Sequence, residues 1–518
     1  MFDDLRGRPL TWSVTAACAS AYLLFGYDQG VLGGLVTQPT FLSAMGDPSS
    51  LYLGTIVALY NIGCLAGCVV AAVWGNKAGR RNSVLWACVV MLIGAIIQFT
   101  AYGAPQMIAG RLISGVGNGV NTSTVGIYIS EISPAARRGR GVAAQLSCVI
   151  FGTVMAYWID YGTIRSLSGS IVWRFPIAFQ CIFLIVTIIM LTFLPDTPRW
   201  LFAAGRKVES VDVLSRLLDL PPDSAEVRGI ENEMQAAWEL EKMNGEFKWS
   251  SLWREKSDVK KTRRLVLCFM IYLFQMFTGI NVIAFYVTIV LEVYVGFDRE
   301  TSSLVAGCIQ IAFWLGTLPP LWTLDRFGRR KTMIWGGIGL SVALIIFTSG
   351  IAVATPASSR MALAFLFLFE IMFGMSWDTI PWVYAAEITP LDIRHIGTAI
   401  GAFSEWLWTF VSVPEIMVGR LQPLTPRKVV AMITPYAIES LGWKYYLLYC
   451  IMTVLAVVFT YFFVPETANK TLEEIDYVFC KDGSPPSIHQ GGQISGESLM
   501  MGKQQTSSGK FEHGAEQV

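Results

Sequence analysis

Twelve apolar runs, each long enough to cross a bilayer, constrain this chain more than any other feature. A membrane-spanning helix needs about 20 apolar residues, and backbone groups in lipid must hydrogen-bond within the segment. The sequence therefore predicts an all-α membrane protein with twelve transmembrane helices. Six spans are expected in the first half and six in the second, at residues 10–34, 51–74, 84–102, 107–129, 142–162 and 175–194, then 265–294, 302–323, 332–353, 361–384, 397–417 and 443–464.

The distribution of Arg and Lys predicts the orientation. Alternate connections are rich in these residues (75–82, 131–140, 195–264 and 324–331), whereas 36–50 and 102–106 contain none. By the positive-inside rule, both termini and the central segment are expected in the cytoplasm. The predicted parts are a six-helix bundle at 1–194, a cytoplasmic linker with short helices at 195–264, a second six-helix bundle at 265–464 and a mostly disordered cytoplasmic tail at 465–518.

Three short motifs recur in both halves in the same order. Gly79-Arg80-Arg81 returns as Gly328-Arg329-Arg330, Glu131-Ile132-Ser133-Pro134 as Glu387-Ile388-Thr389-Pro390, and Pro195-Asp196-Thr197 as Pro465-Glu466-Thr467. Two six-helix halves repeated in parallel are typical of alternating-access transporters.

The charged members of these motifs are expected to form a cytoplasmic gate that holds the two bundles together while the inside is closed. Exposed ion pairs of about 0–1 kcal/mol each suit a reversible gate. The alternative is that these charges only set the topology. The predicted gate residues are Arg80, Arg81, Glu131, Arg138, Asp325, Arg329, Arg330, Glu387 and Arg394.

One acid, Asp28, lies inside the first apolar run. A carboxylate costs roughly 2.5–3.5 kcal/mol at the centre of a membrane helix, so an acid there usually binds a ligand or a proton. Arg111, in the fourth run, lies at a similar depth and is the candidate counter-ion. The carboxylate stays charged beside Arg111, and separation in apolar surroundings favours the protonated form. The alternatives are a static ion pair and an Asp28 that only reaches water.

A solute site is expected between the halves near mid-membrane. The candidate contacts are amides, an acid and an aromatic ring in the second half: Gln275, Asn281, Gln310, Trp382 and Glu405. Gln275 and Asn281 share no helical face, so a break near Gly279 is predicted, and Pro381 predicts a kink. Amides with aromatic walls fit a neutral polyhydroxylated ligand.

Other function classes find little support in the sequence. No nucleophile–base set, phosphate loop or metal cluster is visible, so neither an enzyme nor a cofactor is expected. Nine of the ten cysteines lie in apolar runs and are interpreted as small hydrophobic residues. A net charge of +1 gives no field that favours nucleic acid. The expected partners are a small solute, protons and the lipid bilayer, and the protein is expected to be a monomer.

One segment departs from the pattern. Residues 414–435 contain four prolines and place Arg420, Arg427 and Lys428 on the predicted outer side. This placement violates the positive-inside rule. The segment is either an outer loop or a gene-prediction error, such as a translated intron.

The motifs together resemble the sugar porter family of the major facilitator superfamily. The resemblance runs from about Thr11 to Asp476 and includes PDTPRW at 195–200, GIN at 279–281, DRFGRR at 325–330 and PETANKTLEEID at 465–476. FGYDQG at 25–30 is similar to the fungal branch that includes glycerol–proton symporters. The resemblance implies the major facilitator fold, a plasma-membrane location, an Asp28–Arg111 proton-coupling pair and solute contacts at Gln275, Asn281 and Trp382.

Several positions differ from the pattern of hexose carriers. Leu146 stands where those carriers usually have Gln, Met276 replaces a second Gln, and Gln310 and Glu405 each replace an Asn. These differences favour a polyol or an unusual sugar over glucose. We therefore predict a proton-coupled symporter that imports a sugar or a polyol such as glycerol. The alternatives are a sugar uniporter on the same fold and a non-transporting nutrient sensor.

Overall fold

The computed structural model describes residues 5–36, 38–133, 138–243, 260–281, 296–353, 355–390, 393–412 and 442–468, with the single positions 283, 291, 475 and 479. Regular secondary structure in these residues is helical throughout, and each of the twelve predicted spans has a helical counterpart. The predicted all-α fold of twelve helices in two bundles is confirmed. Residues 414–435 lie outside the described residues.

The N-terminal half holds six long helices and one short one: α1 (Gly7–Leu35), α2 (Pro39–Ala44), α3 (Ser50–Ala78), α4 (Arg80–Phe99), α5 (Ala104–Ile132), α6 (Arg138–Ser166) and α7 (Ile171–Phe193). Three short helices follow: α8 (Pro198–Ala203), α9 (Lys207–Leu218) and α10 (Ala225–Met243). The C-terminal half holds α11 (Lys261–Met276), α13 (Arg299–Thr317), α14 (Pro320–Phe327), α15 (Arg329–Val353), α16 (Pro356–Met375), α17 (Ile380–Ile388), α18 (Arg394–Ser412), the 3₁₀ turn η7 (Gly442–Lys444) and α20 (Tyr445–Phe463).

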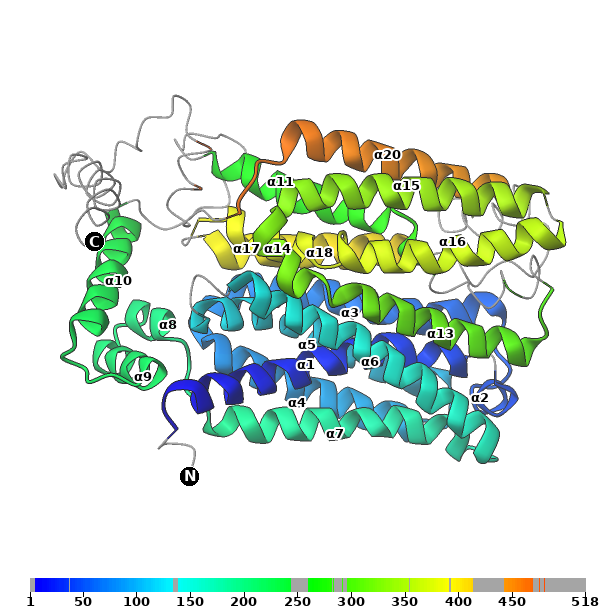
Figure 1. The fold of residues 1–518 in the computed structure, drawn as a ribbon. Coiled ribbons are helices and arrows are strands. Elements are labelled where there is room, and N and C mark those ends of the chain that lie inside the picture. The colour runs from blue at the N-terminus through cyan, green and yellow to red at the C-terminus, as the bar shows by residue number, and fades with distance from the viewer. Residues whose placement is uncertain are drawn as a thin grey trace, which may run out of the picture.

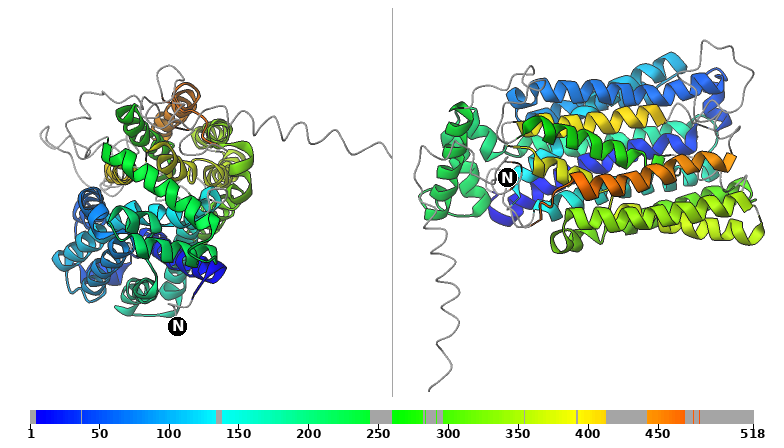
Figure 2. Two further views of the ribbon diagram at one scale, coloured as in Figure 1. Left: turned by 90° about the vertical axis from the view of Figure 1, so that its left-hand side faces the viewer. Right: turned by 90° about the horizontal axis from the view of Figure 1, so that it is seen from above.

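The two halves lie side by side with their long helices roughly parallel (Figure 1). α1–α7 form the lower layer of Figure 1 and α11–α20 form the upper layer, and the end-on view in Figure 2 shows the same separation. The halves meet where α3 and α5 pack against α18, and where α6 packs against α13 and α14. We call the end that carries α8–α10 the linker end; the other is the opposite end.

The surface of the bundles is apolar enough for lipid. Trp74, Ile189 and Phe462 are among many large apolar side chains exposed along the long helices. Seven described helical segments, one of them α16 and α17 taken together, are long and apolar enough to cross a membrane, or eight if the bent pair α13–α14 is one span. α5 is not one of the seven because it carries polar residues such as Asn118 and Asn121, which are buried against protein.

α1 and α6 approach each other closely because Gly26 has no side chain. A Cβ atom at Gly26 would lie 1.6 Å from the carbonyl oxygen of Val149, so no other residue fits there. This contact fixes the depth of α1, and therefore of Asp28, against α6.

Three helix breaks shape the C-terminal half. α11 ends at Met276 and Gly279 has φ +95°, which confirms the predicted break. α16 and α17 are separated by residues 376–379, just before Pro381, because a proline has no N–H for the helical hydrogen bond and its ring clashes with the carbonyl four residues earlier. The predicted span at 302–323 corresponds to α13 and α14, which meet at a 42° bend.

Candidate functional site

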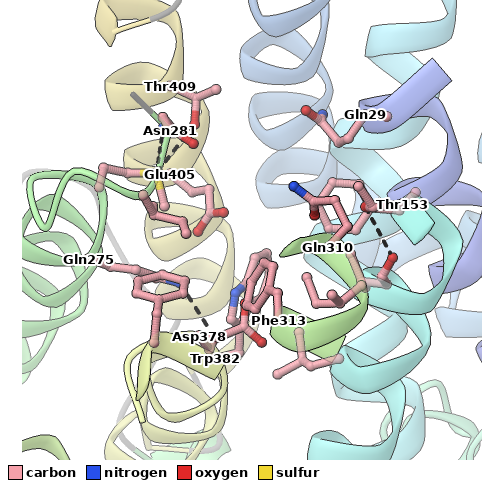
Figure 3. A pocket seen from close by; sticks show the side chains of 18 of the residues that line it. Gln29, Thr153, Gln275, Asn281, Gln310, Phe313, Asp378, Trp382, Glu405 and Thr409 are labelled. Atoms are coloured by element: carbon pink, nitrogen blue, oxygen red, sulfur yellow. Dashed lines mark hydrogen bonds between the residues drawn. The ribbon is translucent and has the colours of Figure 1, made fainter. Parts of the chain in front are cut away.

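A cavity of about 150 Å³ lies between the two halves. Its walls come from α1 and α6 on the N-terminal side and from α11, α13, α16, α17 and α18 on the C-terminal side (Figure 3). All five residues predicted to contact a solute line it: Gln275, Asn281, Gln310, Trp382 and Glu405. The break after α11 brings Gln275 and Asn281 to the same space, as their spacing requires.

The contacts of these residues leave polar atoms directed at the cavity. Gln275 donates through Nε2 to the carbonyl oxygen of Asp378 at 3.4 Å, and its Oε1 has no hydrogen-bond partner. The same is true of Oδ2 of Asp378, Oε2 of Glu405 and Nε2 of Gln29. Buried polar groups are costly when unpaired, so these atoms are available to a ligand. Three of the four are acceptors on the C-terminal side, and they suit a ligand rich in donors.

Aromatic rings complete the walls. The Trp382 ring packs edge-on against Tyr272, with the ring centres 5.2 Å apart. Trp406 packs edge-on against Phe25 and Tyr60 of the N-terminal half, at 5.5 Å and 5.9 Å. These rings provide flat apolar faces beside the polar atoms, the combination that binding sites for small polar molecules use.

Two buried contacts join the halves next to the cavity. Trp406 donates through Nε1 to the hydroxyl of Thr122 at 3.3 Å. The hydroxyl of Thr317 donates to that of Ser147 at 2.9 Å. Both bonds must break if the halves separate there.

The predicted Asp28–Arg111 pair is present as a buried ion pair. Nη1 of Arg111 lies 3.2 Å from Oδ1 of Asp28, and the two side chains are 4% and 0% exposed. The Arg111 guanidinium also lies over the Tyr60 ring, 4.2 Å from its centre. Because Tyr60 contacts Trp406, a short path of side chains connects the ion pair with the cavity.

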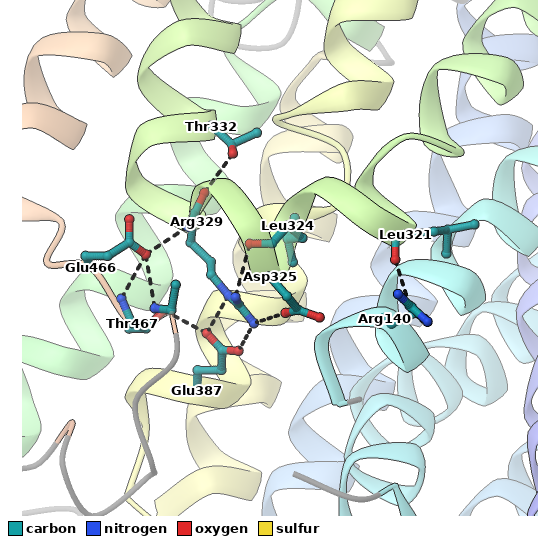
Figure 4. Close-up of polar contacts among 11 residues, drawn as sticks. Arg140, Leu321, Leu324, Asp325, Arg329, Thr332, Glu387, Glu466 and Thr467 are labelled. Atoms are coloured by element: carbon teal, nitrogen blue, oxygen red, sulfur yellow. Dashed lines mark hydrogen bonds and ion pairs between the residues drawn. The ribbon is translucent and has the colours of Figure 1, made fainter. Parts of the chain in front are cut away.

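The repeated motifs form matching networks at the linker end. In the N-terminal half, Nη2 of Arg80 lies 3.1 Å from Glu131, and Thr197 donates to the other Glu131 oxygen at 2.5 Å. In the C-terminal half, Nη2 of Arg329 lies 2.7 Å from Glu387, and Thr467 donates to Glu387 at 2.7 Å (Figure 4).

The remaining motif residues also repeat their contacts. Arg81 donates to the carbonyl oxygens of Leu191 and Thr192 at the end of α7, and Arg330 donates to that of Tyr461 near the end of α20. Asp325 adds an ion pair of 3.1 Å to Arg329. Its counterpart by position in the N-terminal half is Asn76.

Residues 12–422 and 424–479 match the protein family described as "Sugar (and other) transporter". The chain belongs to this family, the sugar porters of the major facilitator superfamily. It is therefore a multi-pass membrane transporter and not an enzyme.

Relatives and solved structures agree. The MFS-type transporter oryC of Aspergillus oryzae is 34% identical over 92% of this chain and 86% of its own length. The sugar transporter STL1 of Saccharomyces cerevisiae is 32% identical over 93% of this chain and 84% of its own. The structure of the proton:xylose symporter XylE bound to 6-bromo-6-deoxy-D-glucose superposes with a TM-score of 0.77 at 25% identity, over 91% of this chain and 99% of that one.

Sequence reasoning missed the N-terminal wall of this sugar porter. Gln29, Thr153 and Tyr157 line the cavity. Gln29 directly follows Asp28, and this neighbouring position in a membrane span could have identified Gln29 as a candidate contact. Leu146 also lines the cavity, whereas Gln145 donates to the carbonyl oxygen of Thr15. The cavity therefore lacks an amide at the position where hexose carriers were expected to have Gln.

The gate prediction needs correction in one respect. The sequence led us to expect ion pairs that hold the two bundles together, but Arg80–Glu131 and Arg329–Glu387 each lie within one half. They fasten helices inside each bundle. A contact between the halves comes from Arg140, whose Nε donates to the carbonyl oxygen of Leu321 at 2.9 Å (Figure 4).

Two predicted gate residues relate differently to this network. Burial opposes the ionisation of Glu131, but Arg80, the Thr197 hydroxyl, Arg199 and Arg394 of the other half hold the pKa of Glu131 below its ordinary value. Arg394 thus acts electrostatically across the interface. The side chain of Arg138 lies outside the described residues.

Proposed function

We propose that this transporter imports a small polyhydroxylated solute, a sugar or a polyol such as glycerol, together with protons. The observation that carries the proposal is the cavity between the halves, where amides, carboxyl groups and two indole rings meet. Hydroxyl groups both donate and accept hydrogen bonds, so a polyol satisfies the unpaired atoms of both walls. The similarity to the sugar transporter STL1 and to the proton:xylose symporter XylE supports a sugar-like solute.

In alternating access, the polar contacts between the halves break and re-form. The solute binds between the halves, and the bonds Trp406–Thr122 and Thr317–Ser147 break as the halves separate on one side. Arg394 near Glu131, and Arg140 where it contacts α14, then act as the gate between the bundles. The ion pairs within each half keep each bundle rigid while it moves.

Proton coupling is assigned to Asp28 and Arg111. Asp28 binds the proton and Arg111 gates it, and a rearrangement of α1 against α5 that separates the pair opens the carboxyl group to the proton. Tyr60 transmits the change, because its ring contacts both Arg111 and the cavity residue Trp406. A solute that moves Trp406 therefore disturbs the surroundings of the ion pair.

The same proposal includes the setting of the molecule. The linker end, with its many basic residues, faces the cytoplasm of a plasma membrane, and both termini lie there. Residues 1–194 and 265–464 act as the two moving bundles, 195–264 as the cytoplasmic linker and 465–518 as the tail of a monomer.

Uptake measurements test the solute and the coupling. Labelled glycerol, hexoses and disaccharides are offered to yeast cells that lack their own carriers, with and without a protonophore. Symport predicts uphill accumulation that the protonophore abolishes. Asp28→Asn is expected to lose accumulation but retain exchange of solute across the membrane.

A matched control is Asp160→Asn, which removes another buried acid of the N-terminal half that does not line the cavity. This control is expected to accumulate solute as the parent does. Accumulation that survives in Asp28→Asn contradicts the proton role and favours a uniporter. Binding without any uptake favours a nutrient sensor.

A further inference from the structure

The C-terminal wall of the cavity carries two carboxyl groups, Asp378 and Glu405. Asp378 lies in the break between α16 and α17, and Glu405 lies on α18 (Figure 3). Asp378 is only 9% exposed, and neither its Oδ2 nor Oε2 of Glu405 has a hydrogen-bond partner. Both acids therefore present a buried, unpaired oxygen to the cavity.

No cation accompanies these acids in the described part of the chain. Asp378 and Glu405 are the only charged side chains among the described residues that line the cavity. Arg111 is already paired with Asp28 and does not line it. Ionising both carboxyl groups is costly, because like charges repel and an oxygen of each group is buried without a partner.

The surroundings of the pair add further negative or neutral groups. Glu370 on α16 lies within electrostatic range of Asp378, and Asp378 within range of Glu405. The other described titratable side chains that interact with Glu405 are Tyr22 of α1, Cys68 of α3 and Tyr272 of α11. None of these described groups is a cation that could balance the charge of the two acids.

We infer that Asp378 and Glu405 form a second proton-binding site, separate from Asp28 and in direct contact with the solute. A hydronium ion of the surrounding water gives its proton to one of the carboxyl oxygens: an O–H bond of hydronium breaks, the O–H bond of the acid forms, and a water molecule is left. The protonated acid donates and the ionised one accepts, so the pair can hold two neighbouring hydroxyl groups of a polyol. The proton site is independent of the solute's identity, whereas its link to transport rests on the proposed function.

Infrared difference spectroscopy of the purified full-length protein tests the site with the proton alone as probe. The spectra compare acid and neutral pH and record the C=O stretch of protonated carboxyl groups. A pH-dependent carboxyl band is expected to remain in Asp28→Asn and in the control Asp160→Asn. The band is expected to lose intensity or shift when Glu405→Gln or Asp378→Asn is added to Asp28→Asn. Other buried acids, such as Glu370 and Asp160, are present in all these Asp28→Asn proteins, so only the change on adding a cavity substitution is scored. Loss of the whole band in Asp28→Asn alone overturns the inference, as does a band that neither cavity substitution changes.

A second measurement uses labelled glycerol and xylose in the Asp28→Asn background, where uphill accumulation is already absent. In the Asp28→Asn protein, the exchange rate of the probe that is carried is expected to depend on pH. Adding Glu405→Gln is expected to remove this pH dependence. If neither probe is carried, the proposed transport of a sugar or polyol is contradicted, while the infrared result still decides whether the proton site exists. The two proposals can therefore be rejected independently. Binding of a cationic amino sugar such as glucosamine without proton release overturns the inference, because the pair is then an ionised cation site.

Discussion

The indole nitrogen of Trp406 donates a hydrogen bond of 3.3 Å to the hydroxyl of Thr122, and this buried bond joins the two halves beside the cavity. Trp406 is also part of the cavity wall. Because Trp406 contacts both the solute site and the opposite bundle, a solute that moves Trp406 also changes the contact between the halves. The bond is therefore expected to favour the state in which the halves are in contact there.

Replacing Thr122 with Val removes the acceptor and keeps the size of the side chain. A hydrogen bond contributes about 0.5–1.5 kcal/mol, so the balance between closed and open linker ends should shift towards open by roughly 2- to 10-fold. Distances between spin labels on α5 and α18 at the linker end measure this balance. Ser123→Ala is the control, because the Ser123 hydroxyl bonds within α5 to Gly119. Equal distance distributions in Thr122→Val and the parent would contradict the role of the bond.

Tyr60 is predicted to couple the ion pair to the cavity. Its ring lies 4.2 Å from the Arg111 guanidinium carbon and packs against Trp406. Tyr60→Leu removes a cation–π contact worth about 2 kcal/mol in a desolvated site and removes the ring between the two residues. Solute exchange is expected to continue, with fewer protons moved per solute, as measured by simultaneous proton and solute fluxes.

Tyr60→Phe keeps the ring and removes the hydroxyl, which interacts with Asp28, so it separates the effect of the ring from that of the hydroxyl. A parent-like stoichiometry is expected for it. If Tyr60→Leu also transports with unchanged stoichiometry, the coupling does not pass through this ring.

The sequence predicts the fold and the C-terminal wall of the cavity better than the N-terminal wall. Twelve spans follow from hydropathy, because lipid leaves a chain few alternatives to helices. The break at Gly279 followed from the spacing of Gln275 and Asn281. The bend between α13 and α14 and the contribution of Gln29 depend on packing between helices far apart in sequence, which no single-helix pattern encodes. The charged residues of the repeated motifs were expected to join the two bundles, but Arg80 and Glu131 pair within one bundle.

Gly328 is predicted to be irreplaceable for two separable reasons. Its backbone angles, φ +89° and ψ +163°, lie in a region that essentially only glycine occupies, and a residue with a Cβ loses roughly 1–3 kcal/mol there. A Cβ there would also lie 2.5 Å from a carboxylate oxygen of Glu466. Gly328→Ala should therefore lower the thermal stability of the purified protein.

The control Gly205→Ala separates the two effects, because Gly205 has φ +81° and a Cβ at this position would meet no atom within 4 Å. Gly205→Ala is expected to lose only the backbone part. Equal losses at the two positions would mean that the contact with Glu466 contributes nothing.

Glu131 is predicted to give the linker end a pH-dependent stability. Its pKa is held below the ordinary value of 4.5, against burial, by Arg80, Thr197, Arg199 and Arg394. A carboxyl whose pKa is lowered by folding stabilises the folded protein above its unfolded pKa, and this contribution disappears as the pH falls through the folded pKa. Glu131→Gln should therefore be less stable than the parent near neutral pH. The gap in stability between the two proteins should shrink and disappear as the pH falls below about 4.5.

Thermal unfolding of the two proteins across this range measures the gap. Asp196, whose pKa is raised by burial, contributes the opposite slope but is present in both proteins, so the difference isolates Glu131. Glu209→Gln is the control, because Glu209 pairs with Arg206 on an exposed surface where screening leaves little energy. A gap for Glu131→Gln that stays constant with pH would show that its contribution is packing and hydrogen bonding, because an ionic contribution must disappear when the carboxylate takes up a proton.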